Sequence, residues 1–484
     1  MASQEEIKDI RIEKLKKLEA LGMNPYPSTV PQDMTLSEVK DTFEALEKSG
    51  DEKSVAGRIM AIRGQGAILF VVLYDGTAQF QIVLKKDVLG EEALQQFVDL
   101  IDIGDFISFS GTFFVTQRGE QSMQATRFVL AAKSLLSLPE KWHGIQDDDE
   151  RFRKRYLDIL TNSEVRDMFL LKTKFWRATR DFLEEKGFMA VDTPTLEVTT
   201  GGAEAAPFAT HNDYDFDVYL RISVGELWQK RLMAAGFPKT YEIGRVYRNE
   251  GSSPNHLQEF TNMEFYWAYA DYNMGMDLVK EMYRRIATEV FNKTSFTTRG
   301  HTFDLADEWT KIQYVEEIQK QTGVDVLTAT TGDIEAKLLE LHVKHDGKTK
   351  ERMVDALWKY CRKNISGPAF VVGYPDFMQP LAKRDAKNGA YVEQFQVLLG
   401  GAELGKGYSE LNDPIDQRAR FEHQQELLKA GDKEAMMPDW EFVEMLEHGM
   451  PPTCGFGFGE RLFSFLVDKP IRETQLFPLM RPRE

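Results

Sequence analysis

The segment that most constrains the fold is residues 239–272, KTYEIGRVYRNEGSSPNHLQEFTNMEFYWAYADY. Two runs rich in aromatic and β-branched residues flank GSSPNH, whose Gly, Ser, Pro and Asn residues cannot continue a strand. We therefore expect two antiparallel strands joined by a loop. Because side chains alternate between the faces of a strand, one face is predicted to be charged and the other apolar. The charged face carries Glu242, Arg248, Glu250, Glu264 and Tyr266, and the apolar face carries Met263, Phe265, Trp267 and Tyr269.

The charged face of this hairpin needs partners, because burying an uncompensated charge costs several kcal/mol. A ligand with charges of both signs would supply them. Arg248 offers a planar fork for a carboxylate or phosphate, and Glu264 beside the Tyr266 hydroxyl suits an ammonium group. The alternative is an exposed hairpin whose polar face is solvated.

The composition is that of a globular protein of two or three domains, with 484 residues of which 42% are hydrophobic. The charged N-terminus lacks the apolar centre of a signal peptide, and no apolar run is long enough to span a bilayer, so we expect a cytoplasmic protein without a membrane partner. A net charge of -17 argues against non-specific polyanion binding but allows a local basic patch. Cys361 and Cys454 are too isolated for a disulfide framework or a zinc site.

The pattern along the chain predicts an α+β protein. Residues 1–50 form helices, with possible capping boxes at Ser3 and Thr35. Residues 51–138 contain five short strands with one helix between the third and fourth, which is the element order of an oligonucleotide-binding barrel. Residues 139–162 form a linker. Residues 163–484 form a second domain that begins with a long helix and has a helical insertion near 330–364.

Small barrels of this kind bind single-stranded nucleic acid by stacking bases on aromatic side chains and by holding phosphates with basic ones. The residues that we place on such a surface are Arg58, Arg63, Phe70 and Gln81. A structural role is the alternative for each of them.

Two glycine-rich segments near the C-terminus carry further candidate residues. In YVEQFQVLLGGAELGKGYSELND, Glu403 and Glu410 would lie on opposite faces of a straight strand, so they reach one site only if Gly405 or Gly407 makes a bulge. They would then hold Mg²⁺ against the phosphates of a nucleotide; the alternative is two surface acids. In PPTCGFGFGERLFSFLVD, the alternate glycines let a flat group lie on bare backbone, and Arg461 suits an adenine ring or a phosphate.

Together these segments resemble the class II lysyl-tRNA synthetases of bacterial type over nearly the whole chain. GFMAVDTPTLEV, GRVYRNEGSSPNHLQEFTNMEFYWAYADY and GFGFGERLFSFL resemble the three class-defining motifs in order. LPEKWHG, RYLDIL, GGAEAAPFATHN and GAELGKGYSELND are similar to the lysyl subgroup. Three details depart from it: RISVGEL is one residue longer than the usual RIAPEL, one residue fewer precedes Glu460, and Ala67 stands where Lys is common.

The resemblance implies a catalytic domain built on an antiparallel sheet flanked by helices, an anticodon-binding barrel, and a homodimer formed through the first motif. The implied reaction activates L-lysine with ATP and transfers it to the 3′ end of tRNA(Lys). The implied catalytic residues are Arg248 and Arg461, and Mg²⁺ would be bound by Glu403 and Glu410. The residues implied to bind ATP are Arg248, Glu250, His256, Phe260, Glu403 and Arg461. Those implied to bind lysine are Gly202, Glu226, Arg248, Glu264, Tyr266 and Asn412.

Three other functions stay open at this point. An aspartyl or asparaginyl synthetase would need a cation or amide donors where this chain has Glu264. A lysine ligase that acts on a protein would lack the barrel. A non-catalytic tRNA-binding protein with the same fold would have no need of Arg248, Glu403, Glu410 and Arg461.

Overall fold

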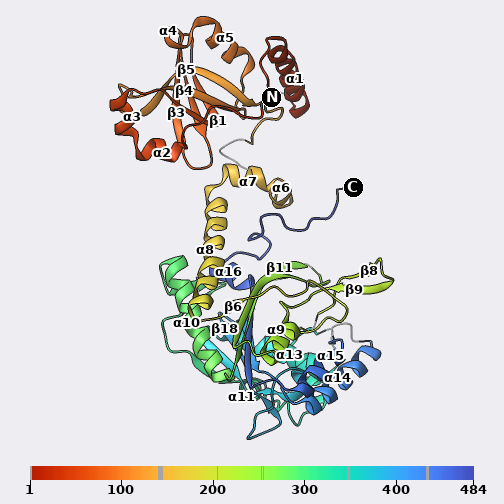
Figure 1. Cartoon of the computed structure of the whole chain (residues 1–484). Helices are drawn as coiled ribbons and strands as arrows, with labels where there is room; N and C mark the ends of the chain where they lie inside the picture. The colour runs from red at the N-terminus through yellow and green to blue at the C-terminus, as the bar shows by residue number, and fades with distance from the viewer. Residues whose placement is uncertain are drawn as a thin grey trace. The chain divides into compact units, whose positions relative to one another are not determined.

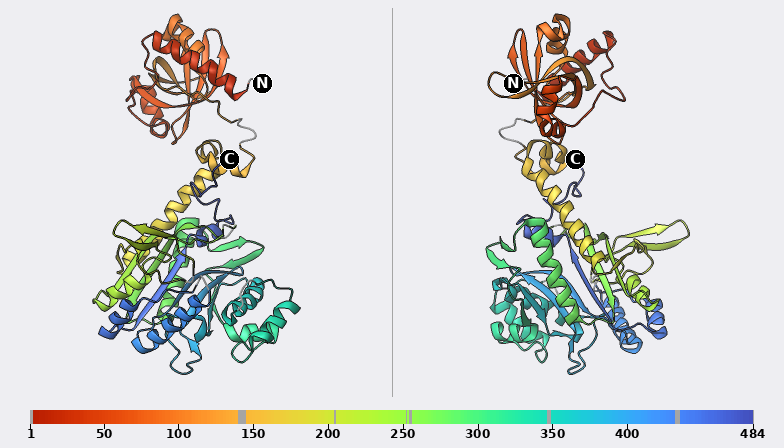
Figure 2. Two further views of the ribbon diagram at one scale, coloured as in Figure 1. Left: turned by 90° about the vertical axis from the view of Figure 1, so that its right-hand side faces the viewer. Right: turned by 60° about the vertical axis from the view of Figure 1, so that its left-hand side comes forward.

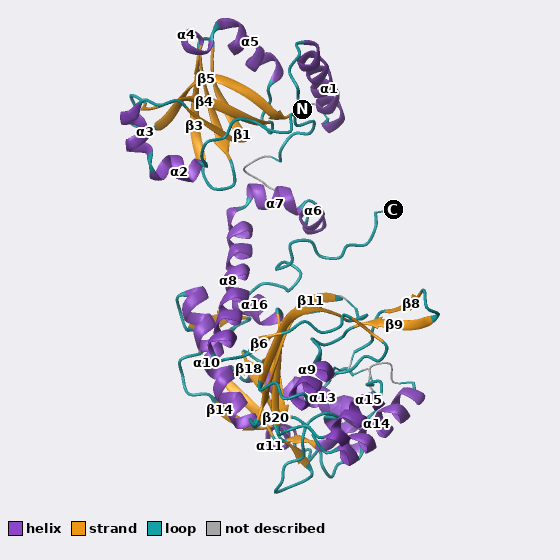
Figure 3. Cartoon of the chain, viewed as in Figure 1, coloured by secondary structure: helices purple, strands orange, loops and turns teal. Residues whose placement is uncertain are grey.

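The computed structural model describes residues 3–139, 145–203, 205–251, 253, 256–345, 349–431 and 435–483. The chain forms two compact units, Met1–Gln146 and Asp147–Glu484 (Figure 1). Each unit combines helices with a strand framework, as the colouring of Figure 3 shows, so the predicted α+β class is confirmed.

The first unit is a barrel preceded by helices. Its elements are α1 (Gln4–Ala20), α2 (Leu36–Asp41), α3 (Phe43–Ser49), β1 (Lys53–Gln65), β2 (Ile68–Tyr74), β3 (Gln79–Lys85), α4 (Lys86–Leu89), α5 (Glu91–Leu100), β4 (Phe106–Val115) and β5 (Gln121–Ala132). In the described part of this unit five strands close into a barrel in the order β1-β2-β3-β5-β4. The predicted helical segment between the third and fourth strands is present as α4 and α5, and the capping boxes at Ser3 and Thr35 are confirmed.

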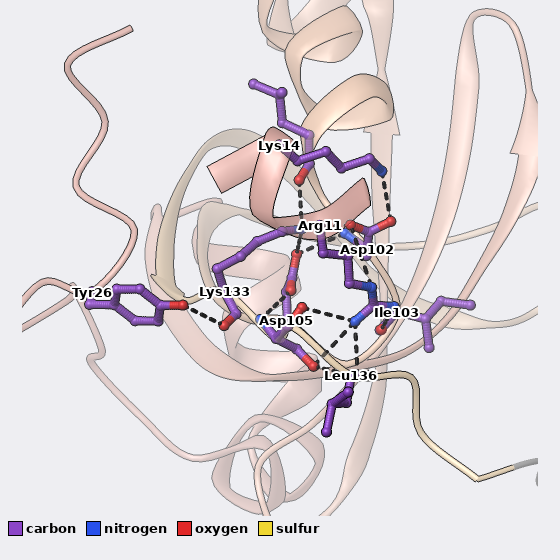
Figure 4. Close-up of polar contacts among 10 residues, drawn as sticks. Arg11, Lys14, Tyr26, Asp102, Ile103, Asp105, Lys133 and Leu136 are labelled. Atoms are coloured by element: carbon purple, nitrogen blue, oxygen red, sulfur yellow. Dashed lines mark hydrogen bonds and ion pairs between the residues drawn. The ribbon is translucent and has the colours of Figure 1, made fainter. Parts of the chain in front are cut away.

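A network of buried charges attaches α1 to the barrel (Figure 4). The ammonium of Lys133, whose side chain is fully buried, lies 2.6 Å from Asp102 Oδ2 and 2.7 Å from Asp105 Oδ2. From α1, Lys14 Nζ lies 2.7 Å from Asp102 Oδ1, and Arg11 donates to backbone carbonyl oxygens at 3.0 Å. Because each buried charge has a partner of opposite sign, the network does not pay the penalty of an isolated buried ion.

The second unit has many short elements around one large sheet. They are α6 (Asp148–Arg153), α7 (Arg155–Thr161), α8 (Ser163–Glu185), β6 (Met189–Ala190), β7 (Leu196–Glu197), β8 (Ala209–Asn212), β9 (Phe216–Leu220), α9 (Glu226–Ala234), β10 (Lys239–Tyr247), β11 (Glu259–Ala268), α10 (Tyr272–Phe291), β12 (Ser295–Thr298), β13 (His301–Asp304), β14 (Thr310–Gln313), α11 (Tyr314–Thr322), α12 (Thr331–Glu340), α13 (Lys350–Cys361), β15 (Ala369–Val372), β16 (Tyr374–Pro375), β17 (Tyr391–Val392), β18 (Gln394–Leu399), β19 (Ala402–Ser409), α14 (Pro414–Lys429), α15 (Trp440–His448), β20 (Thr453–Gly459) and α16 (Arg461–Leu466).

The described strands of the large sheet follow the order β14-β15-β18-β19-β20-β11-β10-β6. The pairs are antiparallel except β14 with β15 and β10 with β6 at the two ends. One face packs against α8, α10 and α16 through a core that includes Met263, Phe265, Phe456 and Phe458. Helices α8 and α10 lie side by side on that face (Figure 1). A second core joins the other face to α9, α11, α13 and α15.

Some details differ from the sequence-based expectations. Within the expected linker 139–162, residues 140–144 lie outside the described residues, and α6 and α7 occupy residues 148–153 and 155–161. The Asp147 side chain caps α6, and the buried Arg155 of α7 donates to carbonyl groups near the C-terminus. Tyr269, expected on the apolar face, is 78% exposed, since β11 ends at Ala268 and the alternation of side chains stops there.

The helical insertion contains α12 and α13, which pack on each other as one lobe in Figure 2. Within the described ranges no helix has the length and apolar character to cross a membrane.

Candidate functional site

A cavity of about 440 Å³ lies on the charged face of the large sheet. It is bounded by β11, β20 and β19, by the first residues of α9 and α16, and by the segment after β10. Among the residues predicted for the site, the cavity lining contains Gly202, Glu226, Arg248, Glu250, His256, Phe260, Glu264, Tyr266, Glu403, Glu410 and Arg461. The alternation argument therefore placed Glu264 and Tyr266 on the correct face of β11.

The glycines of β20 make room for side chains of the neighbouring strands. Gly457 lies opposite Glu264, and Gly455 lies opposite Tyr266. A Cβ atom at Gly455 would approach Glu410 Oε1 to 2.1 Å, and one at Gly457 would approach Glu264 Cγ to 2.7 Å. The bare backbone expected to receive a flat ligand is thus covered partly by these two glutamates.

Glu264 lies near Glu226 in the cavity, in a part that we call the acidic end, and is only 7% exposed. Its carboxylate accepts hydrogen bonds from Val224 N at 2.8 Å, from Asn262 Nδ2 at 2.9 Å and from the Tyr266 hydroxyl at 3.1 Å. Burial, with the nearby charge of Glu226, raises the pKa of Glu264 to about 7. Three neutral donors orient this carboxylate, so a cation that enters the cavity would find it already positioned.

Glu226 and Glu410 share the ammonium of Lys230, which sequence reasoning missed. Lys230 Nζ lies 2.7 Å from Glu226 Oε1 and 2.5 Å from Glu410 Oε2. Burial alone would lower the pKa of Lys230, but the two carboxylates raise it. The longer RISVGEL segment does not turn Glu226 away, because Gly225 takes a left-handed conformation just before α9. The available signal was the spacing of four residues between Glu226 and Lys230 on one helix.

The other end of the cavity carries two guanidinium groups. Arg248 follows the last residue of β10 and lies over the Phe260 ring, with its Cζ atom 5.4 Å from the ring centroid. Arg461 is the first residue of α16, and its buried Nε has no hydrogen-bond partner in the part of the chain that the structure describes. Burial, with the charge of Arg362, lowers the pKa of Arg461 to about 10. The exposed His256 lies near both arginines, and its pKa is lowered by partial burial and by Arg461.

The shortened segment before α16 is held in place by Glu460. This residue is fully buried, its Oε2 lies 2.5 Å from Lys172 Nζ, and its Oε1 accepts from Thr261 N at 3.1 Å. Glu460 therefore anchors the start of α16, and the next residue, Arg461, lines the cavity.

The two glutamates predicted to bind Mg²⁺ differ in their surroundings. The pairing of β18 with β19 shifts register between Glu403 and Lys406, which confirms the predicted bulge. Glu403 accepts from Trp358 Nε1 at 2.6 Å and keeps its second oxygen 3.9 Å from Arg362. Mg²⁺ commonly takes one or two carboxylates together with substrate phosphates, so Glu403 fits this ion. Glu410 places Oε2 2.5 Å from Lys230 Nζ, and its buried Oε1 has no hydrogen-bond partner among the described residues. The described residues contain no cluster of three or more metal-ligating side chains.

Comparisons with known proteins agree with this geometry. A family model described as tRNA synthetases class II (D, K and N) matches residues 147–481, and one described as an OB-fold nucleic acid binding domain matches residues 53–131. The chain belongs to the class II tRNA synthetases. Full-length relatives include a Lysine–tRNA ligase of Moorella thermoacetica, 40% identical over 100% of this chain and 99% of the relative. A Lysine–tRNA ligase of Thermotoga maritima is 37% identical over 99% of this chain and 97% of the relative.

Two residues that the sequence analysis placed at the site, Asn412 and Glu242, are not part of the cavity lining. Asn412 comes three positions after β19 ends, so strand alternation no longer fixes its direction. Its amide accepts from Lys383 Nζ at 2.5 Å and donates to Met450 O at 3.0 Å. Glu242 lies opposite Glu264 in β10, but its carboxylate faces Arg221, whose Nη1 is 2.6 Å away. Neither side chain joins the group that the structure brings together.

On the barrel of the synthetase, three of the four predicted nucleic-acid residues come close together in the strand register. Arg63 of β1 lies opposite Phe70 of β2, and Gln81 of β3 lies opposite Val72, two residues from Phe70. Gln81 donates to the Ser122 hydroxyl at 2.9 Å. Arg58 lies further along β1, with its guanidinium 4.2 Å above the Phe106 ring.

Proposed function

We propose that this chain is a lysine–tRNA ligase, which activates L-lysine with ATP and transfers the lysyl group to the 3′ end of tRNA(Lys). The observation that carries the proposal is the division of one cavity into two ends. Glu226, Glu264 and Glu410 lie close enough together for their charges, with burial, to raise the pKa of Glu264 and of Glu410, and Arg248 and Arg461 both lie close enough to His256 to lower its pKa. The first end suits a dibasic amino acid and the second suits phosphates. The names of the full-length relatives support the same function.

The first reaction step joins two anions. A carboxylate oxygen of lysine attacks the α-phosphorus of ATP, the bond from that phosphorus to the bridging oxygen of the β-phosphate breaks, and pyrophosphate leaves. No proton is transferred, so the step needs no general base. It needs the reactants held in line and their charge neutralised. Arg248 would contact both the carboxylate and the α-phosphate, and Arg461 would contact the nucleotide from the start of α16.

The remaining nucleotide contacts follow from the lining of the basic end. Phe260 would stack on the adenine ring, with Arg461 on the other face of the ring, and Glu250 and His256 would hold the rest of the nucleotide. Glu403 and Glu410 would hold Mg²⁺, which, when bound, supplies positive charge to the phosphate oxygens.

At the acidic end, Glu264 and Tyr266 would receive the side-chain ammonium of lysine, while Gly202 and Glu226 would meet the α-amino group. A neutral amino acid would leave Glu264 unpaired in a buried position. That mismatch costs a few kcal/mol, which is enough to reject an uncharged side chain.

The proposal extends to tRNA and to assembly. Arg58, Arg63, Phe70 and Gln81 would form the surface of the barrel that binds the anticodon, and the reaction would take place in the cytoplasm. We also propose a homodimer through the first motif, which follows α8. Leu170 of α8 and Phe477 near the C-terminus are 52% and 70% exposed, and a partner chain would cover such apolar side chains. A monomeric mass at micromolar concentration would refute the dimer.

The exchange of labelled pyrophosphate into ATP, with each amino acid offered singly, tests the catalytic proposal. We expect exchange with lysine and none with aspartate or asparagine. Exchange with aspartate or asparagine alone would refute the proposal, and no exchange with any amino acid would indicate a non-catalytic tRNA-binding protein. Charging of a tRNA(Lys) transcript then tests the second step.

A further inference from the structure

The helical insertion reaches the cavity through α13. Trp358 of this helix is 1% exposed, and its Nε1 donates to Glu403 Oε1 at 2.6 Å. Arg362, the residue that follows α13, places its Nη2 3.9 Å from Glu403 Oε2. Two side chains of the insertion therefore approach the two oxygens of one carboxylate, and that carboxylate lines the cavity.

The indole of Trp358 is held by neighbouring rings. The Tyr314 ring lies between two others, with its centroid 4.9 Å from that of Trp358 and 4.3 Å from that of Tyr374. The Tyr374 hydroxyl donates to Gln396 Oε1 at 2.7 Å, and Gln396 also lines the cavity. An indole packed among buried rings has little room to change rotamer, so its N–H keeps one direction.

The end of the insertion also holds the backbone that carries Glu403. Gly400 and Gly401 form the turn between β18 and β19, and Glu403 is the second residue of β19. The N–H groups of these two glycines donate to the main-chain oxygens of Ser366 and Ile365 at 2.6 and 2.8 Å. The insertion therefore fixes both the main chain next to this glutamate and one oxygen of its side chain.

We infer that Trp358 is a positioning residue for the nucleotide site, whose indole N–H holds one oxygen of Glu403 and leaves the other available to the Mg²⁺ that accompanies ATP. The inference rests on the proposed function and deepens it, because it gives the helical insertion a part in binding the metal–nucleotide complex. The Glu403 side chain is 21% exposed, so without the N–H its carboxylate could rotate. Fixing the orientation of a ligand in advance lowers the cost of binding the metal.

Nucleotide binding without turnover tests this inference. The affinity for a non-hydrolysable ATP analogue would be measured by equilibrium dialysis in the presence of lysine, once at saturating Mg²⁺ and once in excess EDTA. Trp358→Phe, which keeps an aromatic ring and removes the N–H, should weaken binding at saturating Mg²⁺ by roughly tenfold. In EDTA it should change the affinity less than about twofold, and the same limit should hold at saturating Mg²⁺ in a Glu403→Ala background.

Trp309→Phe is the matched control, because Trp309 is 5% exposed and its Nε1 donates to a main-chain oxygen, that of Leu305, at 3.2 Å. It should lower the melting temperature and leave the affinity at saturating Mg²⁺ within about twofold. Three results would each overturn the inference and assign Trp358 to packing alone. They are an equal loss with and without Mg²⁺, an equal loss in the Glu403→Ala background, and a similar loss in the control.

A second variant covers the case in which Trp358→Phe does not fold. Benzothienylalanine at position 358 keeps both rings and has sulfur in place of the N–H, so it removes the hydrogen bond and keeps the packing. An unchanged affinity at saturating Mg²⁺ with this residue would also overturn the inference. Failure of the proposed function is distinct, because the unaltered chain would then show no lysine-dependent pyrophosphate exchange.

Discussion

The charge of Glu264 gives the sharpest test of the amino-acid pocket. Glu264→Gln keeps the shape of the side chain and removes its charge. The groups that donate to Glu264 in the structure, from Val224, Asn262 and Tyr266, are all neutral. A substrate ammonium would therefore be the charged partner of this carboxylate. Removing one member of such a buried pair costs about 3 kcal/mol. At about 1.4 kcal/mol per factor of ten, this loss corresponds to a roughly hundredfold rise in the lysine KM.

Pyrophosphate exchange measures this effect when lysine is varied at saturating ATP and ATP is then varied at saturating lysine. We expect the ATP KM to change less than threefold. Glu242→Gln is the matched control, because Glu242 lies opposite Glu264 in the sheet but pairs with Arg221 outside the cavity. The control should lower the melting temperature and leave the lysine KM within threefold. Equal rises in both KM values for Glu264→Gln, or a similar rise in the lysine KM for the control, would refute the assignment.

The same carboxylate predicts a pH dependence. Burial raises the pKa of Glu264 to about 7, so the group is largely protonated at pH 6 and ionised at pH 8. The ionised form is the one that binds an ammonium, and the lysine KM should therefore fall as the pH rises through 7. This part of the pH profile should be lost in Glu264→Gln, and a profile that survives the substitution would assign the titration to another group.

Three further predictions concern other parts of the unit. Arg461→Ala should raise the ATP KM at least tenfold in the exchange assay, because the buried Nε lacks a partner among the described residues; an unchanged value would exclude a nucleotide contact. Gly455→Ala should reduce lysine-dependent exchange at least tenfold, since the new Cβ would lie 2.1 Å from Glu410 Oε1, whereas Gly389→Ala, which meets nothing within 4 Å, should not. Burial raises the pKa of Glu197 from 4.5 to about 7, so stability present below pH 4.5 is lost as the pH rises through 7. Glu197→Gln should therefore be more stable than the parent at pH 8 by about 2 kcal/mol, but not at pH 4, in urea denaturation; a similar difference at both pH values would contradict this.

The parts of the site that the sequence predicted well are those that local geometry controls. Alternation along β11 placed Glu264 and Tyr266 on the charged face and Met263 and Phe265 in the core. The spacing of seven between Glu403 and Glu410 required a bulge, and the register shift in β19 supplies it. These inferences needed only the strand period and the steric freedom of glycine.

The parts that the sequence did not predict depend on contacts between distant elements. Glu226 and Lys230 have the spacing of an ordinary exposed ion pair on a helix, and only the packing of β19 and α15 around α9 shows that the pair is buried. The contact of Glu410 Oε2 with the Lys230 ammonium was missed for the same reason. Asn412 lies beyond the end of a strand, where the period gives no direction. The contacts of α7 also depend on distant residues, because Arg155 donates to carbonyl groups more than 300 positions away.

The glycines of β20 have one more consequence for substrate choice. At Gly455 and Gly457 the strand has no side chains, so Glu410 and Glu264 lie directly against its main chain, which is paired with β11 and β19 on its two sides. A wall of this kind has no rotamers with which to accommodate a larger guest. A longer diamine chain would have to distort the sheet, whereas a shorter one would fail to span the distance between its charged partners. We therefore expect this strand to limit the length of the amino acid that the pocket accepts.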